Sequence, residues 1–273
     1  MKSRILIFGK GFIGQRLHQE WRCPVSTKRI ENFADVSAEI RKCQPKILIN
    51  CIGHTGKGDV DGCELALDKT LSANTYIPIL LAEVALRNNI KLVHISSGCI
   101  YHYDYSKQAP ITEDLPPDYY HLYYSRSKIY AENALRELAK RYNILVVRIR
   151  IPLDDRPHPK NILTKLIKFE KVIDVPNSLT YVPDFIKALE HLIKIDARGI
   201  YNIVCKGGLR YPQLLDVYQR YVPDFQYKIM ALKQLKMERT NVVLSVCKLE
   251  QSGFRVRTTG EMLEECVQRY VKF

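Results

Sequence analysis

The stretch that decides the fold is Arg4-Ile-Leu-Ile-Phe-Gly-Lys-Gly-Phe-Ile-Gly-Gln-Arg-Leu17. Its apolar run Ile5–Phe8 predicts a short buried strand, and G-x-G-x-x-G follows directly before a helical pattern. In this setting Gly9 allows a tight turn, Gly11 lets the backbone approach a pyrophosphate, and Gly14 lets the helix pack close to the strand. The N-terminus of that helix offers free N–H groups to phosphates. The stretch therefore predicts a dinucleotide site rather than a plain turn.

Strands and helices alternate over the first 150 residues. Strands are expected near 24–27, 46–50, 91–96 and 143–149, and helices near 12–21, 35–43, 63–88 and 122–141. This alternation predicts right-handed βαβ units and an α/β fold with a Rossmann-type, doubly wound parallel sheet. The rhythm changes after Pro152. We therefore expect an NADP(H)-binding Rossmann domain over 1–152. Residues 153–273 are expected to form mainly a smaller substrate-binding lobe, with some segments returning to the main sheet.

Composition narrows the class of protein. Of 273 residues, 46% are hydrophobic and 26% are charged, which indicates a globular and not a disordered chain. The formal net charge of +13 favours an anionic ligand. Since no block of basic residues stands out, we expect phosphates in a cleft and no nucleic-acid partner.

The eight cysteines bear on compartment and metal binding. They form no C-x-x-C and no zinc-type spacing, so we expect reduced thiols, no metal and a cytoplasmic location. Ile5–Phe8 is too short for the apolar part of a secretory leader. No apolar run reaches the length that spans a membrane, so no membrane partner is expected.

The end of the second strand predicts the kind of dinucleotide. A carboxylate at this position binds a ribose 2′-hydroxyl, whereas a basic residue accommodates a 2′-phosphate. Here Lys28 and Arg29 follow the strand, and Lys10 lies inside the glycine turn, which favours NADP(H) over NAD(H). Cys51 and Gly53 close the third strand at the same edge. The other cofactor contacts expected in the turn are Phe12 and Ile13.

The residues expected to perform chemistry follow the fourth strand and open the next helix. Tyr124 and Lys128 stand four residues apart, on one face of that helix. A neighbouring ammonium favours the phenolate, so this pair can pass a proton at neutral pH. Ser97, at the end of the strand, can donate to the same substrate oxygen. Cys99 would lie over the substrate, unless it is a packed small hydrophobe.

A second Tyr-x-x-x-Lys begins at Tyr103. It lies in a polar stretch ahead of Pro110 with no helical periodicity after it, so we interpret it as accidental.

Together these motifs resemble those of the extended short-chain dehydrogenases/reductases. The shared motifs are Gly9-x-Gly11-Phe12-Ile13-Gly14, Asn50-Cys51-Ile52-Gly53, Asn74, Ser96-Ser97 and Tyr124-x-x-x-Lys128. Within that family the chain is most similar to the nucleotide-rhamnose synthase 3,5-epimerase/4-reductases. The stretches that carry this second likeness are 55–64, 97–101, 148–152, 171–178 and 239–241.

The resemblance implies a bifunctional enzyme that acts on a nucleotide-linked 4-keto-6-deoxy-glucose. Ser97, Tyr124 and Lys128 would reduce the 4-keto group with NADPH, and Lys128 would also contact the cofactor. Cys99 and Lys171 would serve as acid–base partners for inversion at C3 and C5. The GDP-fucose synthases share the cysteine but pair it with a histidine. The implied substrate contacts are Asn74, Asn177, Arg239 and Asn241.

This chain also departs from the family pattern. Gly62 replaces a bulky aromatic residue, and Val242, Val243 and Leu244 stand where an aspartate is expected. Either departure could affect substrate recognition, so the choice between a UDP and a dTDP sugar stays open. A homodimer is a further partner that stays open.

Three other functions compete with this hypothesis. A plain 4-reductase needs neither Cys99 nor Lys171. A non-catalytic NADP(H)-binding regulatory subunit would not need Ser97, Tyr124 and Lys128 intact. Binding of nucleic acid through the net charge predicts salt-dependent binding without competition by NADPH.

Overall fold

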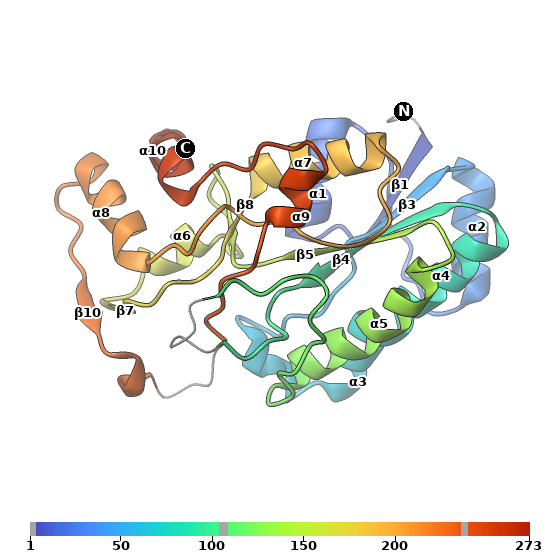
Figure 1. Cartoon of the computed structure of the whole chain (residues 1–273), viewed down its shortest axis with the longest axis horizontal. Helices are drawn as coiled ribbons and strands as arrows, with labels where there is room; N and C mark the ends of the chain where they lie inside the picture. The colour runs from blue at the N-terminus through green and yellow to red at the C-terminus, as the bar shows by residue number, and fades with distance from the viewer. Residues whose placement is uncertain (1–3, 104–108, 236–239) are drawn as a thin grey trace. The chain divides into compact units, whose positions relative to one another are not determined.

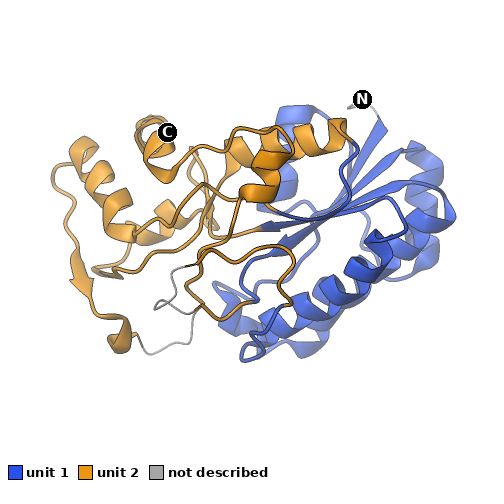
Figure 2. Cartoon of the chain, viewed as in Figure 1, with its two compact units in different colours: residues 1–100, 117–148, 196–201 blue, residues 101–116, 149–195, 202–273 orange. Residues whose placement is uncertain are grey.

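The chain folds into two compact units, which Figure 2 distinguishes by colour. The computed structural model describes residues 4–103, 109–235 and 240–273. Unit 1 comprises Met1–Ile100, Pro117–Arg148 and Asp196–Tyr201, and unit 2 comprises Tyr101–Pro116, Ile149–Ile195 and Asn202–Phe273. The chain therefore crosses between the units more than once: the loop from Tyr101 joins the second unit, and a short segment at Asp196 returns to the first.

Unit 1 is built on a parallel sheet. Within the described residues the sheet has six strands in the order β2-β1-β3-β4-β5-β9. Their bounds are β1 Ile5–Phe8, β2 Val25–Ser26, β3 Ile47–Asn50, β4 Lys91–Ser97, β5 Ile144–Ile149 and β9 Gly199–Asn202. β1 pairs in parallel with β2 and β3, and β3 pairs in parallel with β4. Every residue of β1 and β4 is buried, as expected for strands covered on both faces.

Helices cover both faces of this sheet. α2 (Phe33–Cys43), α4 (Ile77–Arg87) and α5 (Tyr123–Ala139) lie on one side in Figure 1, and α1 (Phe12–Trp21) lies on the other. The core on the three-helix side joins alternate strand residues to the helices. It includes Leu6, Phe8, Leu48, Leu92, Val36, Leu81, Val84 and Leu135. The predicted α/β class with a doubly wound parallel sheet is confirmed.

The segment between β3 and β4 is helical over much of the predicted region 63–88, in which Pro78 is expected to interrupt the helix or to start its second part. It begins with a 3₁₀ turn, η2 (Val60–Cys63), and α3 (Leu67–Leu71) follows. A π-helical segment, η3 (Ser72–Tyr76), then leads directly into α4. Pro78 falls in the first turn of α4, where its missing N–H is tolerated. The spacing of apolar residues in the sequence does not reveal the extra residue of a π turn.

Unit 2 combines strands of two or three residues with helices, the longest of which among the described residues, α7 (Val182–Lys194), has 13 residues. Two small parallel pairs occur among its described residues, β6 (Pro152–Leu153) with β8 (Thr180–Tyr181), and β7 (Lys171–Ile173) with β10 (Lys228–Met230). The helical elements are α6 Ile162–Leu166, α7 Val182–Lys194, α8 Tyr211–Tyr221, η4 Leu232–Gln234, α9 Cys247–Gln251 and α10 Thr259–Tyr270. Its core joins these elements through residues such as Leu163, Tyr181, Leu214, Met262 and Cys266. No helix among the described residues is long and apolar enough to cross a membrane.

Candidate functional site

The glycine turn after β1 has the geometry that a dinucleotide requires. Gly9 has a φ of +98°, and a Cβ there would come within 2.6 Å of the Cys51 carbonyl carbon and the Ile52 nitrogen. A Cβ on Gly14 would lie 1.9 Å from the Gly9 carbonyl oxygen. A Cβ on Gly11 would meet nothing within 4 Å. Two glycines therefore close the turn against the protein, and Gly11 faces open space that a phosphate can approach.

A cavity of about 550 Å³ opens at this turn. It is lined by Gly9 and Lys10, by residues 26–31 after β2, by residues 52–54 after β3 and by one side of the segment from Asp68 to Ile77. Its volume lies within the range of about 300–1,000 Å³ that is usual for ligand pockets. The residues present fit a dinucleotide, because a glycine cradle, an open approach and several cations meet in one cavity.

The structure places the predicted cofactor contacts in two groups. Five of them line the cavity: Gly9, Lys10, Lys28, Arg29 and Gly53. The others lie outside its lining: Gly11, Phe12, Ile13, Gly14, Cys51 and Lys128. Cys51 lies beneath the turn, with its Cβ 3.4 Å from the Cβ that Gly14 would carry, and burial raises the pKa of its thiol. We interpret Cys51 as packing that supports the turn.

The two cations after β2 are already paired. Lys28 Nζ lies 2.9 Å from Asp35 Oδ1, and Arg29 Nε lies 2.9 Å from Glu31 Oε1. The hydrogen bond from Lys28 lowers the pKa of Asp35. Both cations are exposed enough that solvent weakens these pairs. They can therefore turn toward a phosphate, with part of their charge already balanced.

Lys128 reaches the floor of this region from α5. Its Nζ lies 3.3 Å from the position of a Cβ on Gly53, and Asn74 Oδ1 lies 3.4 Å from the same position. Lys128 is buried, and burial lowers the pKa of its ammonium to about 8. Negative charge on Cys63, Cys51 or Glu132 works in the opposite direction. Lys128 therefore lies close to Gly53 in the loop after β3, and its ammonium has a pKa of about 8.

Ser97, Cys99 and the first turn of α5 are joined by hydrogen bonds. The Ser97 hydroxyl accepts a bond from the Cys99 N–H at 3.1 Å, and the Ser125 hydroxyl donates to the Cys99 carbonyl at 2.5 Å. Ser97 ends β4, and Tyr124 lies next to Ser125 and is 7% exposed. The structure therefore joins Ser97 and Cys99 to the first turn of α5, the turn that also carries Tyr124.

Asn74 has a different environment from the one expected of a substrate contact. It is completely buried in η3, and its Oδ1 accepts from the His54 N–H at 2.8 Å. Its Nδ2 donates to the His54 carbonyl at 2.9 Å and to the Ser127 hydroxyl at 3.1 Å. Both ends of the amide are engaged within the protein. Asn74 thus ties the loop after β3 to α5, and a role in substrate binding stays a prediction.

In unit 2 two of the predicted substrate residues meet around a buried arginine. Arg150 Nε donates to Asn177 Oδ1 at 2.7 Å, and Arg150 also donates to the hydroxyl and the carbonyl oxygen of Thr240. Asn177 Nδ2 donates to Asn241 Oδ1 at 2.9 Å. Asn177 therefore holds Asn241 in place. Lys171 begins β7 and is exposed, and Arg239 lies outside the described residues.

Sequence reasoning missed a buried ion pair behind the Tyr–Lys helix. Glu132 and Arg148 are fully buried, and Arg148 Nη2 lies 2.5 Å from Glu132 Oε1. The Ser96 hydroxyl donates to Glu132 Oε2 at 3.0 Å. The pair links α5, β4 and β5 and puts a carboxylate one turn beyond Lys128. In the sequence this pair is indicated only by two charged residues within otherwise apolar patterns. The sequence does not show that they contact each other, because they lie on different elements.

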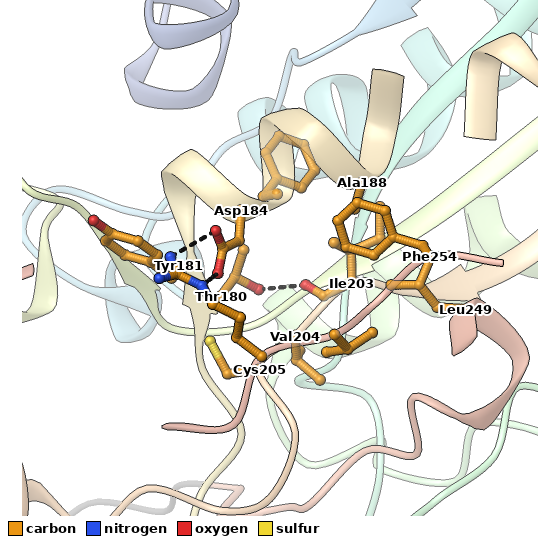
Figure 3. Close-up of a pocket in the computed structure, with 12 residues that line it drawn as sticks. Thr180, Tyr181, Asp184, Ala188, Ile203, Val204, Cys205, Leu249 and Phe254 are labelled. Carbon is orange, nitrogen blue, oxygen red and sulfur yellow. Dashed lines mark hydrogen bonds and ion pairs between the residues drawn. The ribbon is translucent and has the colours of Figure 1, made fainter. Parts of the chain in front are cut away.

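A second cavity, in unit 2, has no chemistry of this kind. Its volume is about 20 Å³, which suits a single water molecule. Figure 3 shows Asp184, Thr180 and Ile203 around it, with Thr180 Oγ1 donating to the Ile203 carbonyl at 2.7 Å. Arg257 donates to Asp184 at 2.8 Å. This cavity is a packing defect among paired groups.

No metal centre is evident in the described part of the chain, where no group of three or more His, Cys, Asp or Glu side chains could hold a metal ion.

The parallel sheet, the glycine turn and the Tyr–Lys pair at its edge define a Rossmann-fold protein of the short-chain dehydrogenase/reductase type. The chain belongs to the RmlD substrate-binding-domain family, whose pattern matches residues 3–186. The resemblance inferred from the motifs is thereby confirmed.

Several curated relatives come from Arabidopsis thaliana, including one bifunctional and one trifunctional enzyme. A bifunctional dTDP-4-dehydrorhamnose 3,5-epimerase/dTDP-4-dehydrorhamnose reductase is 29% identical over 262 residues, which cover 90% of this chain and 86% of that protein. A trifunctional UDP-glucose 4,6-dehydratase/3,5-epimerase/reductase is 29% identical over 243 residues, which cover 85% of this chain. The match spans 36% of that longer protein, so the chain corresponds to about a third of it.

Solved structures share the fold. The UDP-rhamnose synthase L780 of Acanthamoeba polyphaga mimivirus has a TM-score of 0.90 at 24% identity, covering 97% of this chain and 98% of that one. The dTDP-4-dehydrorhamnose reductase of Bacillus anthracis, solved in complex with NADP, has a TM-score of 0.81 at 21% identity, covering 100% and 99%.

Proposed function

We propose that this protein is an NADPH-dependent 3,5-epimerase/4-reductase that converts a nucleotide-linked 4-keto-6-deoxy-glucose to the corresponding L-rhamnose. The proposal is supported by the hydrogen bonds that join Ser97, Cys99 and Ser125, and so link the end of β4 to the helix that carries Tyr124 and Lys128. Lys128 Nζ also approaches Gly53, which lines the cavity that fits a dinucleotide. The Arabidopsis relatives carry epimerase and reductase activities in their names.

The reductive step is assigned to Tyr124, Lys128 and Ser97. When bound, NADPH supplies a hydride to C4 of the ketosugar. Tyr124 donates its phenolic proton to the C4 oxygen, so the carbonyl becomes an alcohol. The Lys128 ammonium stabilises the phenolate that remains, and Ser97 donates a hydrogen bond to the same oxygen. Water then reprotonates Tyr124.

The inversion at C3 and C5 is assigned to Cys99 and Lys171. The C4 carbonyl acidifies the hydrogens on both neighbouring carbons. One residue removes a proton and leaves an enediolate, and the other returns a proton on the opposite face of the ring. Cys99 belongs to the same hydrogen-bonded turn as Ser97. Lys171 is exposed at the start of β7, as a plain surface cation would be, so its assignment rests on the family resemblance.

The product of a direct assay tests this proposal. The full chain is incubated with NADPH and either UDP- or dTDP-4-keto-6-deoxy-glucose, and the sugar is identified by NMR. We expect a nucleotide-L-rhamnose, and the better of the two substrates identifies the nucleotide. Absence of both NADPH oxidation and product would contradict the assignment of an enzyme.

A plain 4-reductase is the second candidate. The observation that favours it is that Lys171 is exposed at the start of a three-residue strand, where an ordinary surface cation would also stand. This candidate predicts that the protein reduces the 4-keto group without inverting C3 or C5. The same assay separates the two, because a plain reductase would leave the D-configured ketosugar without inversion.

A further inference from the structure

One wall of the dinucleotide cavity carries a cation that the sequence motifs do not include. Asp68, Lys69, Ser72, Ala73 and Ile77 line the cavity from the helical segment that starts at α3. Lys69 and Ser72 are three residues apart, and Lys69 and Ala73 are four apart, so they share one side of the helix. The π turn of η3 adds one residue at this point, and Ser72 and Ala73 both reach the cavity.

Lys69 differs from two of the other cations around the cavity because no carboxylate among the described residues pairs with it. Four cations line it, Lys10, Lys28, Arg29 and Lys69. Lys28 and Arg29 already pair with Asp35 and Glu31. Lys10 and Lys69 have no ion-pair partner among the residues that the structure describes. They come from different elements, Lys10 from the glycine turn and Lys69 from α3, so their charges face the cavity from separate segments.

We propose that Lys69 is a phosphate-binding residue of the cofactor site, acting together with Lys10 on the phosphates of the bound dinucleotide. The inference rests on the proposed function, since it requires that the cavity takes NADP(H). An ammonium on a flexible stem binds a phosphate as a point charge and needs no fixed fork geometry. The buried neighbour Thr70 fixes the helix, because its hydroxyl lies 2.9 Å from His54 Nδ1 and donates to the Cys63 carbonyl.

Direct titration of the full chain tests this inference without any turnover. The dissociation constants of NADPH and NADH are measured by cofactor fluorescence for the wild type and for Lys69→Ala. We expect NADPH binding to weaken about tenfold, and to lose part of its dependence on ionic strength because one charge contact is gone. A loss confined to NADPH assigns Lys69 to the 2′-phosphate, and an equal loss for NADH assigns it to the pyrophosphate.

Two variants make the result specific. Lys69→Arg keeps the positive charge and should retain most of the affinity. Lys42→Ala removes an exposed lysine near the end of α2 that does not line the cavity, and should leave both dissociation constants unchanged. Unchanged NADPH binding by Lys69→Ala, in a protein whose wild type binds NADPH, would overturn this inference alone. Failure of the wild type to bind either dinucleotide would instead overturn the proposed function.

Discussion

Lys128 is the side chain whose charge decides whether Tyr124 can act as an acid. Burial lowers the pKa of its ammonium to about 8, and the charged form is the one that stabilises the phenolate. The ammonium therefore prevails below pH 8 and is lost as the pH rises through that value.

For this reason we expect kcat/KM for ketosugar reduction to be level below pH 8 and to fall about tenfold per pH unit well above it. Lys128→Arg should be slower throughout, but its profile should not fall above pH 8, because a guanidinium keeps its charge. The measurement is the pH dependence of NADPH oxidation for both proteins. The same fall in both would assign the titration to another group.

Tyr124 is tested by removing a single oxygen. Tyr124→Phe should lower kcat about 10²–10⁴-fold, since that is the usual contribution of general acid catalysis. NADPH binding, measured by fluorescence titration, should stay within about twofold, because Tyr124 does not line the cofactor cavity.

Tyr130 is the matched control for Tyr124. It lies on the same helix and is 45% exposed, so Tyr130→Phe should leave the rate unchanged. Near-full activity of Tyr124→Phe would mean that another group gives the proton.

In the glycine turn, substitution of two different glycines by alanine should affect the stability of the fold differently. Gly14→Ala places a methyl group 1.9 Å from the Gly9 carbonyl oxygen, so the turn and α1 must separate. We expect it to lower the free energy of unfolding by about 1–3 kcal/mol and to abolish NADPH binding.

Gly11→Ala meets nothing within 4 Å, and its φ of −76° suits alanine. Its stability should be unchanged or slightly raised, and only its NADPH affinity should fall, because the methyl group stands in the approach of the pyrophosphate. Thermal denaturation and fluorescence titration of the two variants check this. Equal losses of stability would show that Gly11 also closes the turn.

The two proposed activities draw on the units differently: the residues assigned to reduction all belong to unit 1, whereas those assigned to inversion come from both units. Ser97, Tyr124 and Lys128 belong to unit 1, whereas the second acid–base residue of inversion, Lys171, belongs to unit 2. We expect Cys99→Ser and Lys171→Met to stop incorporation of deuterium from heavy water at C3 and C5, since each removes one acid–base partner.

The complementary variant in this experiment is Tyr124→Phe, which should still exchange those hydrogens because their removal needs no hydride. Mass spectrometry and NMR of the recovered sugar give the readout. Reduction of the ketosugar by the wild type without any deuterium at C3 or C5 would favour the plain 4-reductase.

Most of the first unit is predictable from the sequence, because its strands are continuous apolar runs and its glycine turn has a fixed spacing. Tyr124 and Lys128 are predictable for the same reason, since helical periodicity follows them. Glu132 and Arg148 are not, because their partnership spans two elements and leaves no periodic pattern. The two-residue strands β6 and β8 are too short for any periodicity. Unit 2 contains several such pieces, so its candidate residues are predictable mainly from the family resemblance.

Because of the π turn at Ser72–Tyr76, the orientation of α3 relative to α4 depends on the number of residues in this segment as well as on their identity. A regular helix advances about 100° per residue, so deleting one residue there would turn α3 by roughly that angle relative to α4. Lys69 would then rotate off the cavity wall, and the Asn74 amide would lose either His54 or Ser127. A single substitution in the segment does not change the rotation of α3 relative to α4, because the number of residues stays the same. Loss of a single codon would therefore do more damage here than most missense changes, although every remaining side chain would still be the original one.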